Sequence, residues 1–183
     1  MECYCRHFGN ALPLGAIMTD SFQEISIRGR LAYGVTCLES VLKHYGIKNE
    51  LLDEIVLPSI WAFTSSRDLG AWDNSINKID PNNLLGDSVI ISSSNAENPL
   101  KRLYQSLPDF IVEMISNVIE IGTANLYGGT QQGSPHSLKP LKNVIQACKM
   151  NNVTLPDITP FKKSLFEEYH GWGHERERNF FNP

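Results

Sequence analysis

The sequence predicts an all-α protein, an irregular bundle of about six or seven helices that forms one domain over residues 1–183. Five segments repeat apolar residues at intervals of three and four, the spacing of a single buried helix face. Residues that favour helix starts precede several of these segments, and no convincing pair of alternating strand segments is found. No internal repeat or break in composition divides the chain, although its ends (1–18 and 175–183) are less regular.

The first helix is predicted between about 21 and 45, where the apolar spacing is clearest. Asp20 and Gln23 resemble a capping pair at its start, and Gly46 suits the left-handed conformation that ends many helices. One face of this helix is formed by Leu31, Val35, Leu38, Leu42 and Tyr45.

Two more helices are predicted before residue 82. Asn49 is a candidate N-cap for the second helix, and Pro58 should end or kink it because proline lacks the N–H that a helix interior uses. Asp68 is the candidate N-cap of the third helix, which is expected to end before Pro81. The next residues have an ambiguous pattern that fits a short strand around 88–92, a helix end or a loop.

The second half of the chain contains the broadest apolar helix face. Asn98 is a candidate N-cap for a short helix, and Pro108 can begin a longer helix at the centre of the core. The apolar face of that longer helix contains Phe110, Ile111, Met114, Ile115, Val118 and Ile119. The glycine-rich stretch 122–133 that follows is predicted to be a long loop.

Two helices are predicted after this loop. The first has Ser137 as its candidate N-cap, places Ile145 in the core and ends near Met150. The last begins at Thr159, has an aromatic face and is stopped near Gly171, because glycine favours the left-handed backbone beyond a helix end.

Composition excludes several classes of function. The chain has 20 acidic and 16 basic residues and a net charge of -4, so its mean field does not attract nucleic acid. No apolar run approaches the roughly 20 residues that cross a bilayer, and the N-terminal stretch lacks the pattern of a signal peptide. The four cysteines are too few for a disulfide scaffold. We therefore expect a cytoplasmic protein that binds neither nucleic acid nor membrane.

No metal or other cofactor is expected. Cys3, Cys5 and His7 are metal-ligand types, but structural zinc needs four ligands and a wider spacing than Cys-x-Cys. Cys37 and Cys148 lie on apolar helix faces, where a free cysteine packs as a small hydrophobic residue. These four cysteines are therefore not assigned to a site.

The first functional hypothesis is a non-catalytic protein-binding domain, such as a bacterial immunity protein that neutralises a cognate toxin. Small acidic domains without a recognisable catalytic motif fit that role, which is an argument by class only. Asp53 and Glu54 would steer a basic partner, and Trp172 and His174 belong to an aromatic, arginine-rich end of the kind enriched at interfaces. Each pair also has a structural explanation, because acids suit a helix start and Trp172 can pack on the core.

The second hypothesis is an enzyme of unfamiliar type, with a site near His170 and His174 or in the glycine-rich loop 122–137. Glu167 and His170 have the Glu-x-x-His spacing of di-metal helix bundles, but those proteins use two copies and this chain has one. The loop lacks the lysine and hydroxyl of a phosphate-binding loop. No catalytic residue is assigned on this basis.

A third group of polar residues shares one side of the long helix. Glu113, Asn117 and Glu120 are spaced so that they lie together, and two carboxylates at such a spacing can serve as a general acid and a general base. A solvated face opposite the apolar face explains the same pattern and is the preferred interpretation.

Overall fold

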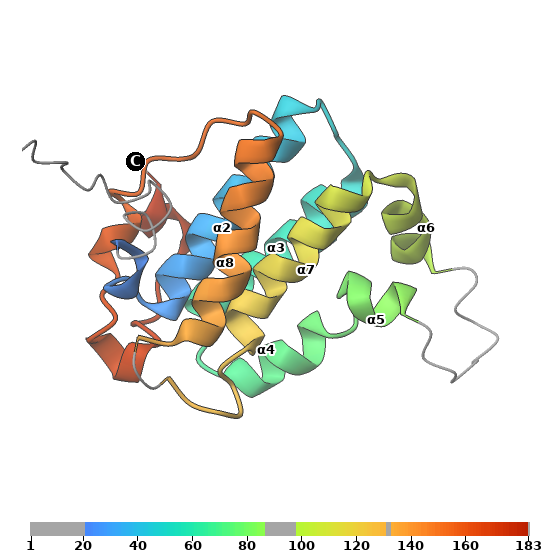
Figure 1. Cartoon of the computed structure of the whole chain (residues 1–183). Helices are drawn as coiled ribbons and strands as arrows, with labels where there is room; N and C mark the ends of the chain where they lie inside the picture. Colours follow the sequence, from blue (N-terminus) through green and yellow to red (C-terminus); the bar gives the residue numbers. More distant parts are fainter. Residues whose placement is uncertain (1–20, 87–97, 131–132, 183) are drawn as a thin grey trace, which may run out of the picture.

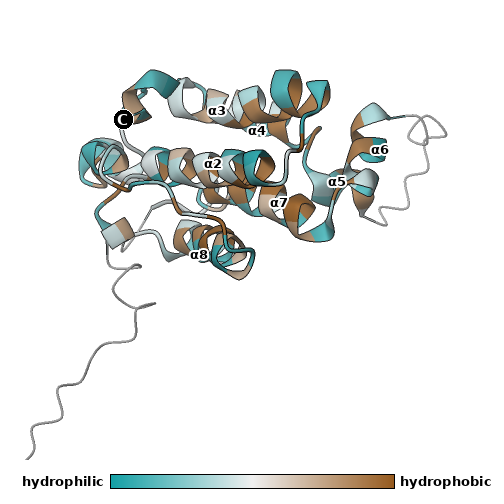
Figure 2. Cartoon of the chain, turned by 90° about the horizontal axis from the view of Figure 1, so that it is seen from above, coloured by the Kyte–Doolittle hydropathy of each residue, from teal (hydrophilic) through white to brown (hydrophobic). Residues whose placement is uncertain are grey.

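Helix α2 (Ile27–His44) is the central element of the protein, and three other helices pack around it (Figure 1). They are α3 (Leu57–Ser65), α7 (Asp109–Thr123) and α8 (Pro135–Met150). Seen from above, α2 lies between α3 on one side and α8 on the other (Figure 2). The computed structural model describes residues 21–86, 98–130 and 133–182.

Three shorter helices complete the bundle. Helix α4 (Leu69–Ile76) packs against α3, whereas α5 (Pro81–Leu85) and α6 (Pro99–Ser106) pack on each other, with α5 also contacting α7. The described residues thus contain seven α-helices and no strand, which confirms the predicted all-α class. The segment around 88–92, for which a short strand was one expectation, lies outside the described residues.

Polar side chains cap four of the seven described α-helices, and two of these, α4 and α6, have the predicted cap. The Asp68 carboxylate accepts a hydrogen bond from the backbone N–H of Ala71 at 2.8 Å, and the Asn98 side chain accepts one from Leu100 at 2.9 Å. Gly46 has a φ of 65° and follows the end of α2, as expected. The N-cap of α2 is Ser26, whose hydroxyl accepts from the Gly29 N–H, whereas the predicted capping residue Asp20 lies outside the described residues.

Pro58 does not end the second helix, which corrects one expectation from the sequence. Asn49 caps the segment as predicted, accepting a hydrogen bond from the Leu51 N–H at 2.9 Å. A π-helical stretch (Leu52–Val56) then runs directly into α3, and Pro58 lies in the first turn of α3. Proline has no N–H to donate, and the change to π-helical hydrogen bonding just before Pro58 interrupts the regular i→i−4 ladder at this place.

The helix predicted from Thr159 to Gly171 is also wrong. Residues 153–182 form an irregular segment, here called the C-terminal strap, with short 3-10 turns and contacts to α2 and α3. Tyr169 and His170 have φ angles of 45° and 56°, a left-handed conformation that an α-helix cannot contain. Of the residues expected on the buried face of this helix, Phe161 is buried, whereas Leu165 and Tyr169 are exposed.

Two arginines at the start of α2 are buried and attach this helix to the rest of the molecule. Arg30 is fully buried, and its guanidinium donates to the carbonyl oxygens of Phe22 at 3.0 Å, Gln23 at 3.0 Å and Ser134 at 3.1 Å. It also donates to the hydroxyl of Ser137 at 2.8 Å. Burial lowers the pKa of Arg30 to about 10. Ser137, the expected N-cap of α8, lies instead in the first turn of this helix, whose N-cap is Ser134.

Arg28 makes the equivalent attachment on the other side of α2. Its guanidinium donates to the carbonyl oxygens of Phe63 and Ser66 at the end of α3, and to that of Gly173 in the C-terminal strap at 3.2 Å. Glu175 lies 3.8 Å away as a half-exposed counter-ion. Most of the charge on Arg28 is thus stabilised by backbone carbonyl dipoles.

Truncating the core at the contact of α2 and α8 is expected to destabilise the protein. Leu38 and Ile145 are both buried, so Leu38→Ala and Ile145→Ala should each lower the free energy of unfolding by about 2 to 5 kcal/mol. Chemical denaturation followed by circular dichroism measures this loss. Wild-type midpoints for both variants would contradict the placement of these side chains.

Replacing Arg30 is expected to cost as much as a core truncation. In Arg30→Met, three carbonyl oxygens lose their buried donor, and we expect a loss of about 3 kcal/mol in the free energy of unfolding. Arg67→Met, at an exposed position, is the matched control and should change stability little. If both variants are equally stable, the buried arginine does not hold the fold together.

Candidate functional site

A groove follows the outer side of α7 and has two connected parts. The larger hollow, about 870 Å³, lies between α5 and α6 on one side and α7 and α8 on the other. The smaller hollow, about 280 Å³, lies between α7 and α8. Three residues line both hollows, namely Glu113, Asn117 and Asn143. We call the two hollows together the α7–α8 groove.

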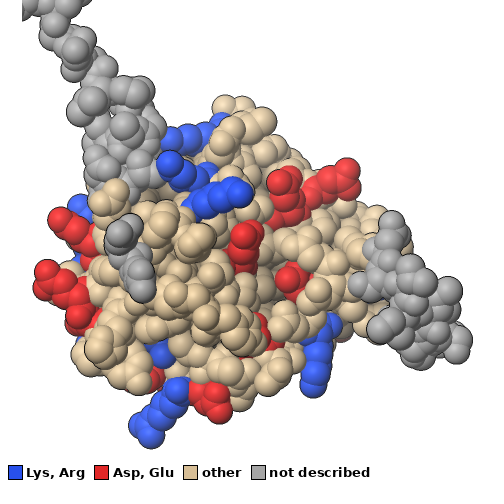
Figure 3. Space-filling view, turned by 60° about the horizontal axis from the view of Figure 1, so that its bottom comes forward, with Lys and Arg blue, Asp and Glu red and all other residues tan. Residues whose placement is uncertain are grey.

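The groove is acidic. Asp109, Glu113 and Glu120 line the larger hollow, and no lysine, arginine or histidine is among the described residues that line either hollow. In the space-filling view, acidic side chains lie across the middle of the face, whereas lysine and arginine side chains lie toward its margins (Figure 3). The remaining polar lining consists mainly of side-chain amides, which are uncharged. The groove therefore has a concentrated negative charge.

The sequence of α7 produces this arrangement. Asp109, Glu113 and Glu120 are separated by four and seven residues, so they lie on one side of the helix, while Ile111 and Ile115 are buried on the other side. Glu113 and Glu120 are exposed, in agreement with the expected solvated face. Asn117, between them, is only 8% exposed, which the sequence pattern did not indicate.

One wall of the groove is fixed by a half-buried carboxyl group. The Asp80 carboxylate caps α5 by accepting from the Asn82 N–H at 2.9 Å, and it accepts a second hydrogen bond from the Ser116 hydroxyl of α7 at 3.4 Å. Burial raises the pKa of Asp80, and these two hydrogen bonds only partly oppose the increase. The hydroxyl of Tyr104 in α6 donates to the Ile79 carbonyl at 2.7 Å. Both contacts hold α5 and α6 beside α7.

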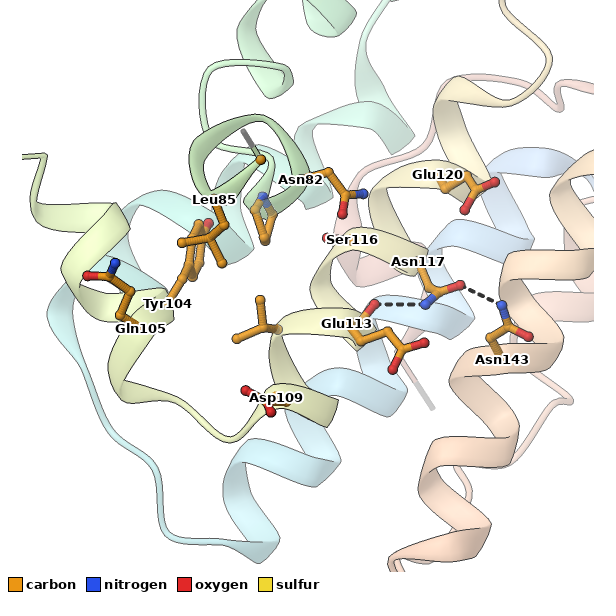
Figure 4. A pocket seen from close by; sticks show the side chains of 13 residues that line it. Asn82, Leu85, Tyr104, Gln105, Asp109, Glu113, Ser116, Asn117, Glu120 and Asn143 are labelled. Carbon is orange, nitrogen blue, oxygen red and sulfur yellow. Dashed lines mark hydrogen bonds between the residues drawn. The ribbon is translucent and has the colours of Figure 1, made fainter. Parts of the chain in front are cut away.

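Side-chain amides connect the other wall to α7 (Figure 4). The Nδ2 of Asn117 donates to the backbone carbonyl of Glu113 at 2.8 Å, and the Nδ2 of Asn143 donates to the Oδ1 of Asn117 at 2.8 Å. We call these two hydrogen bonds the amide relay. Asn143 belongs to α8, so the amide relay crosses the floor of the groove from α7 to α8. The carboxylate of Glu113 lies beside the relay.

The acidic residues predicted to contact a partner lie elsewhere. Asp53 and Glu54 are exposed on the π-helical stretch, and Asp53 lines a separate hollow of about 490 Å³. Lys43, Lys48 and Arg178 line the same hollow, so its charge is mixed. Asp53 and Glu54 therefore lack the concentrated negative charge that lines the α7–α8 groove.

Trp172 and His174 belong to the C-terminal strap and line neither part of the α7–α8 groove. Trp172 is half-buried, and its ring centre lies 6.4 Å from that of Phe63 in α3. Its backbone carbonyl also accepts from the N–H of Arg28. Trp172 thus contributes to the packing of the strap, whereas His174 is exposed.

The regions suggested as an alternative enzyme site do lie together. The hydroxyl of Thr130, in the glycine-rich loop, donates to the backbone carbonyl of His170 in the strap. His170 and His174 are both exposed, and neither lines a hollow described above. Among the described residues, no group of three or more His, Cys, Asp or Glu side chains is placed to hold a metal ion.

Comparisons of the chain with protein-family models, curated protein sequences and solved structures give no match. In the described part of the chain, no helix has the length and apolar character needed to span a membrane. The geometry of the α7–α8 groove is therefore the basis for assigning a function.

Asp80→Asn should stabilise the protein more at pH 7 than at pH 3. The pKa of Asp80 is higher in the folded state than in the unfolded state. The protonated carboxyl group therefore contributes stability below the unfolded-state pKa, and this contribution is lost as the pH rises through the folded-state pKa. Asparagine keeps a neutral cap on α5 at both pH values. Denaturation of both proteins at each pH measures the difference. If Asp80→Asn increased the free energy of unfolding more at pH 3 than at pH 7, the result would contradict the effect of burial on the pKa of Asp80.

Proposed function

We propose that the protein acts by binding another protein, and that a basic segment of this partner occupies the α7–α8 groove. The supporting observation is the combination of three carboxylates with no cationic side chain among the described residues that line the groove. Complementary charge of this kind raises association rates and favours a basic partner over an acidic one. The net charge of -4 acts in the same direction.

The apolar part of the lining favours a polypeptide over a simple counter-ion. Leu85 and Val112 line the larger hollow, and Phe110, Met114 and Met150 line the smaller one. Met150 is 73% exposed and flanks the groove as an adaptable apolar side chain. A segment with basic and apolar side chains would satisfy both kinds of surface.

The exposure of the carboxylates favours binding over acid and base catalysis. Glu113 and Glu120 both face solvent, whereas enzymes with paired carboxyl groups give the two groups different environments, so that one is protonated and the other ionised. An immunity protein that covers a basic surface of its toxin is one class of protein that fits this proposal, by analogy of role only.

Removing two charges from the groove should weaken capture of the partner about tenfold, because rim charges contribute up to about 1 kcal/mol each. The variant is Glu113→Gln with Glu120→Gln, tagged and used to isolate the partner from the native host. Asp53→Asn with Glu54→Gln is the control, since it changes the net charge equally at the other acidic pair. Capture is measured at low and high salt, and binding to wild type should weaken as salt screens the charges.

Two results would contradict the proposal. If the control variant loses the partner and the groove variant keeps it, Asp53 and Glu54 are the contact instead. If neither variant loses a specific partner, the negative charge of the groove has no role in binding.

A further inference from the structure

Two buried cysteines that are far apart in the sequence meet between α2 and α8. Cys37 belongs to α2 and Cys148 to the last turn of α8, and neither side chain is exposed to solvent. Both are free thiols, and they share a side-chain hydrogen bond. The apolar helix faces explain why each cysteine is buried, but they do not explain why the two thiols face each other.

The surroundings of the pair give the two thiols different reactivity. Tyr33, one helical turn before Cys37, also forms a side-chain hydrogen bond with the Cys37 thiol. Burial raises the pKa of Cys37, whereas the hydrogen bond from the Cys37 thiol lowers the pKa of Cys148. Because the thiolate is the reactive form of cysteine, Cys148 is the nucleophile of the pair and Cys37 is the thiol held against it.

The position of Cys148 near a helix end gives a small reagent a way to reach it. Helix α8 ends at Met150, which is 73% exposed, and terminal helical turns open more readily than helix interiors. Cys37 lies inside α2 and lacks this route. Hydrogen peroxide is small and uncharged, which suits entry through a local opening of this kind. Such an oxidant therefore meets Cys148 first.

We propose that Cys37 and Cys148 are a peroxide-sensitive dithiol that oxidises to a disulfide joining α2 to α8. The Cys148 thiolate attacks one oxygen of hydrogen peroxide, which breaks the O–O bond, leaves a sulfenic acid on Cys148 and releases hydroxide. The Cys37 sulfur then attacks the sulfur of this sulfenic acid, and water leaves as the S–S bond forms. In total the two thiols lose two electrons and two protons, and one peroxide becomes two waters.

Peptide mapping of the full folded chain tests the proposal, which does not depend on the function of the groove. The protein is treated with hydrogen peroxide, unfolded, alkylated at its remaining thiols and digested with trypsin. Mass spectrometry should find peptide 31–43 joined to peptide 143–149, with a mass two hydrogen atoms below the sum of the separate peptides. Reduction with dithiothreitol should restore alkylation at both cysteines.

The matched control removes the other two cysteines of the chain. Cys3→Ser combined with Cys5→Ser should form the same link to the same extent, because neither residue takes part in the proposed reaction. This variant also serves as the background for the single variants below.

Two single variants test the order of the steps. Cys37→Ala should leave the sulfenic acid on Cys148 without a second thiol, so dimedone, which traps sulfenic acids, should label Cys148. Cys148→Ala should leave Cys37 unlabelled by dimedone, because burial holds the pKa of Cys37 high. Thermal unfolding establishes that both variants are folded, and the mapping of the wild type decides the main question without them.

Two results would overturn the proposal. In the folded wild type, peroxide could leave Cys37 and Cys148 fully open to alkylation after unfolding, or it could oxidise Cys148 to a sulfinic acid without forming the link. Either result shows that the two thiols do not act as a pair. Labelling of Cys37 in Cys148→Ala, with none of Cys148 in Cys37→Ala, would contradict the assignment of Cys148 as the nucleophile.

Discussion

The burial of two guanidinium groups at the start of α2 is the constraint on which the rest of the structure depends. An arginine removed from water must find acceptors for its donors, and Arg28 and Arg30 find most of them in backbone carbonyls of distant segments. Each segment must therefore approach α2 at a defined place. Arg28 fixes the end of α3 and the C-terminal strap, and Arg30 fixes the turn before α2 and the start of α8.

This constraint extends to the groove through α8. Arg30 binds both the carbonyl of Ser134 and the hydroxyl of Ser137, so it sets the position at which α8 begins. Helix α8 packs against α7, and the amides of Asn143 and Asn117 meet only in that alignment. The contact between the Asn117 and Asn143 amides thus depends on the buried interaction of Arg30 with the start of α8.

Most of the helices could be predicted from the sequence because each depends on local information. Apolar spacing and the caps Asp68 and Asn98 act within a few residues, and these elements occur where the pattern indicates. Phe161, Leu165 and Tyr169 have helical spacing, so the sequence pattern favours a helix in the C-terminal strap, whereas the left-handed backbone at Tyr169 and His170 is imposed by tertiary contacts. The helix continues through Pro58, where the sequence predicts an end or a kink, because a π-helical stretch precedes this residue.

The candidate site was only partly predictable for the same reason. Glu113, Asn117 and Glu120 could be grouped from their spacing on one helix, but the contact of Asn117 with Asn143 depends on how two helices pack. Likewise, nothing local indicates that α5 and α6 form a wall beside α7, since Asp80 and Ser116 are far apart in the sequence. Asp53 and Glu54 form an acidic pair in sequence, yet their surroundings in space include cations.

Carboxyl footprinting of the wild-type protein with and without its isolated partner tests the central claim most directly. Carbodiimide labels exposed carboxylates, and mass spectrometry reports the labelling of each one. We predict that Asp109, Glu113 and Glu120 become protected from labelling in the complex, while Asp53 and Glu54 are labelled as before. Protection of Asp53 and Glu54, with Glu113 and Glu120 still fully labelled, would show that the partner does not occupy the groove.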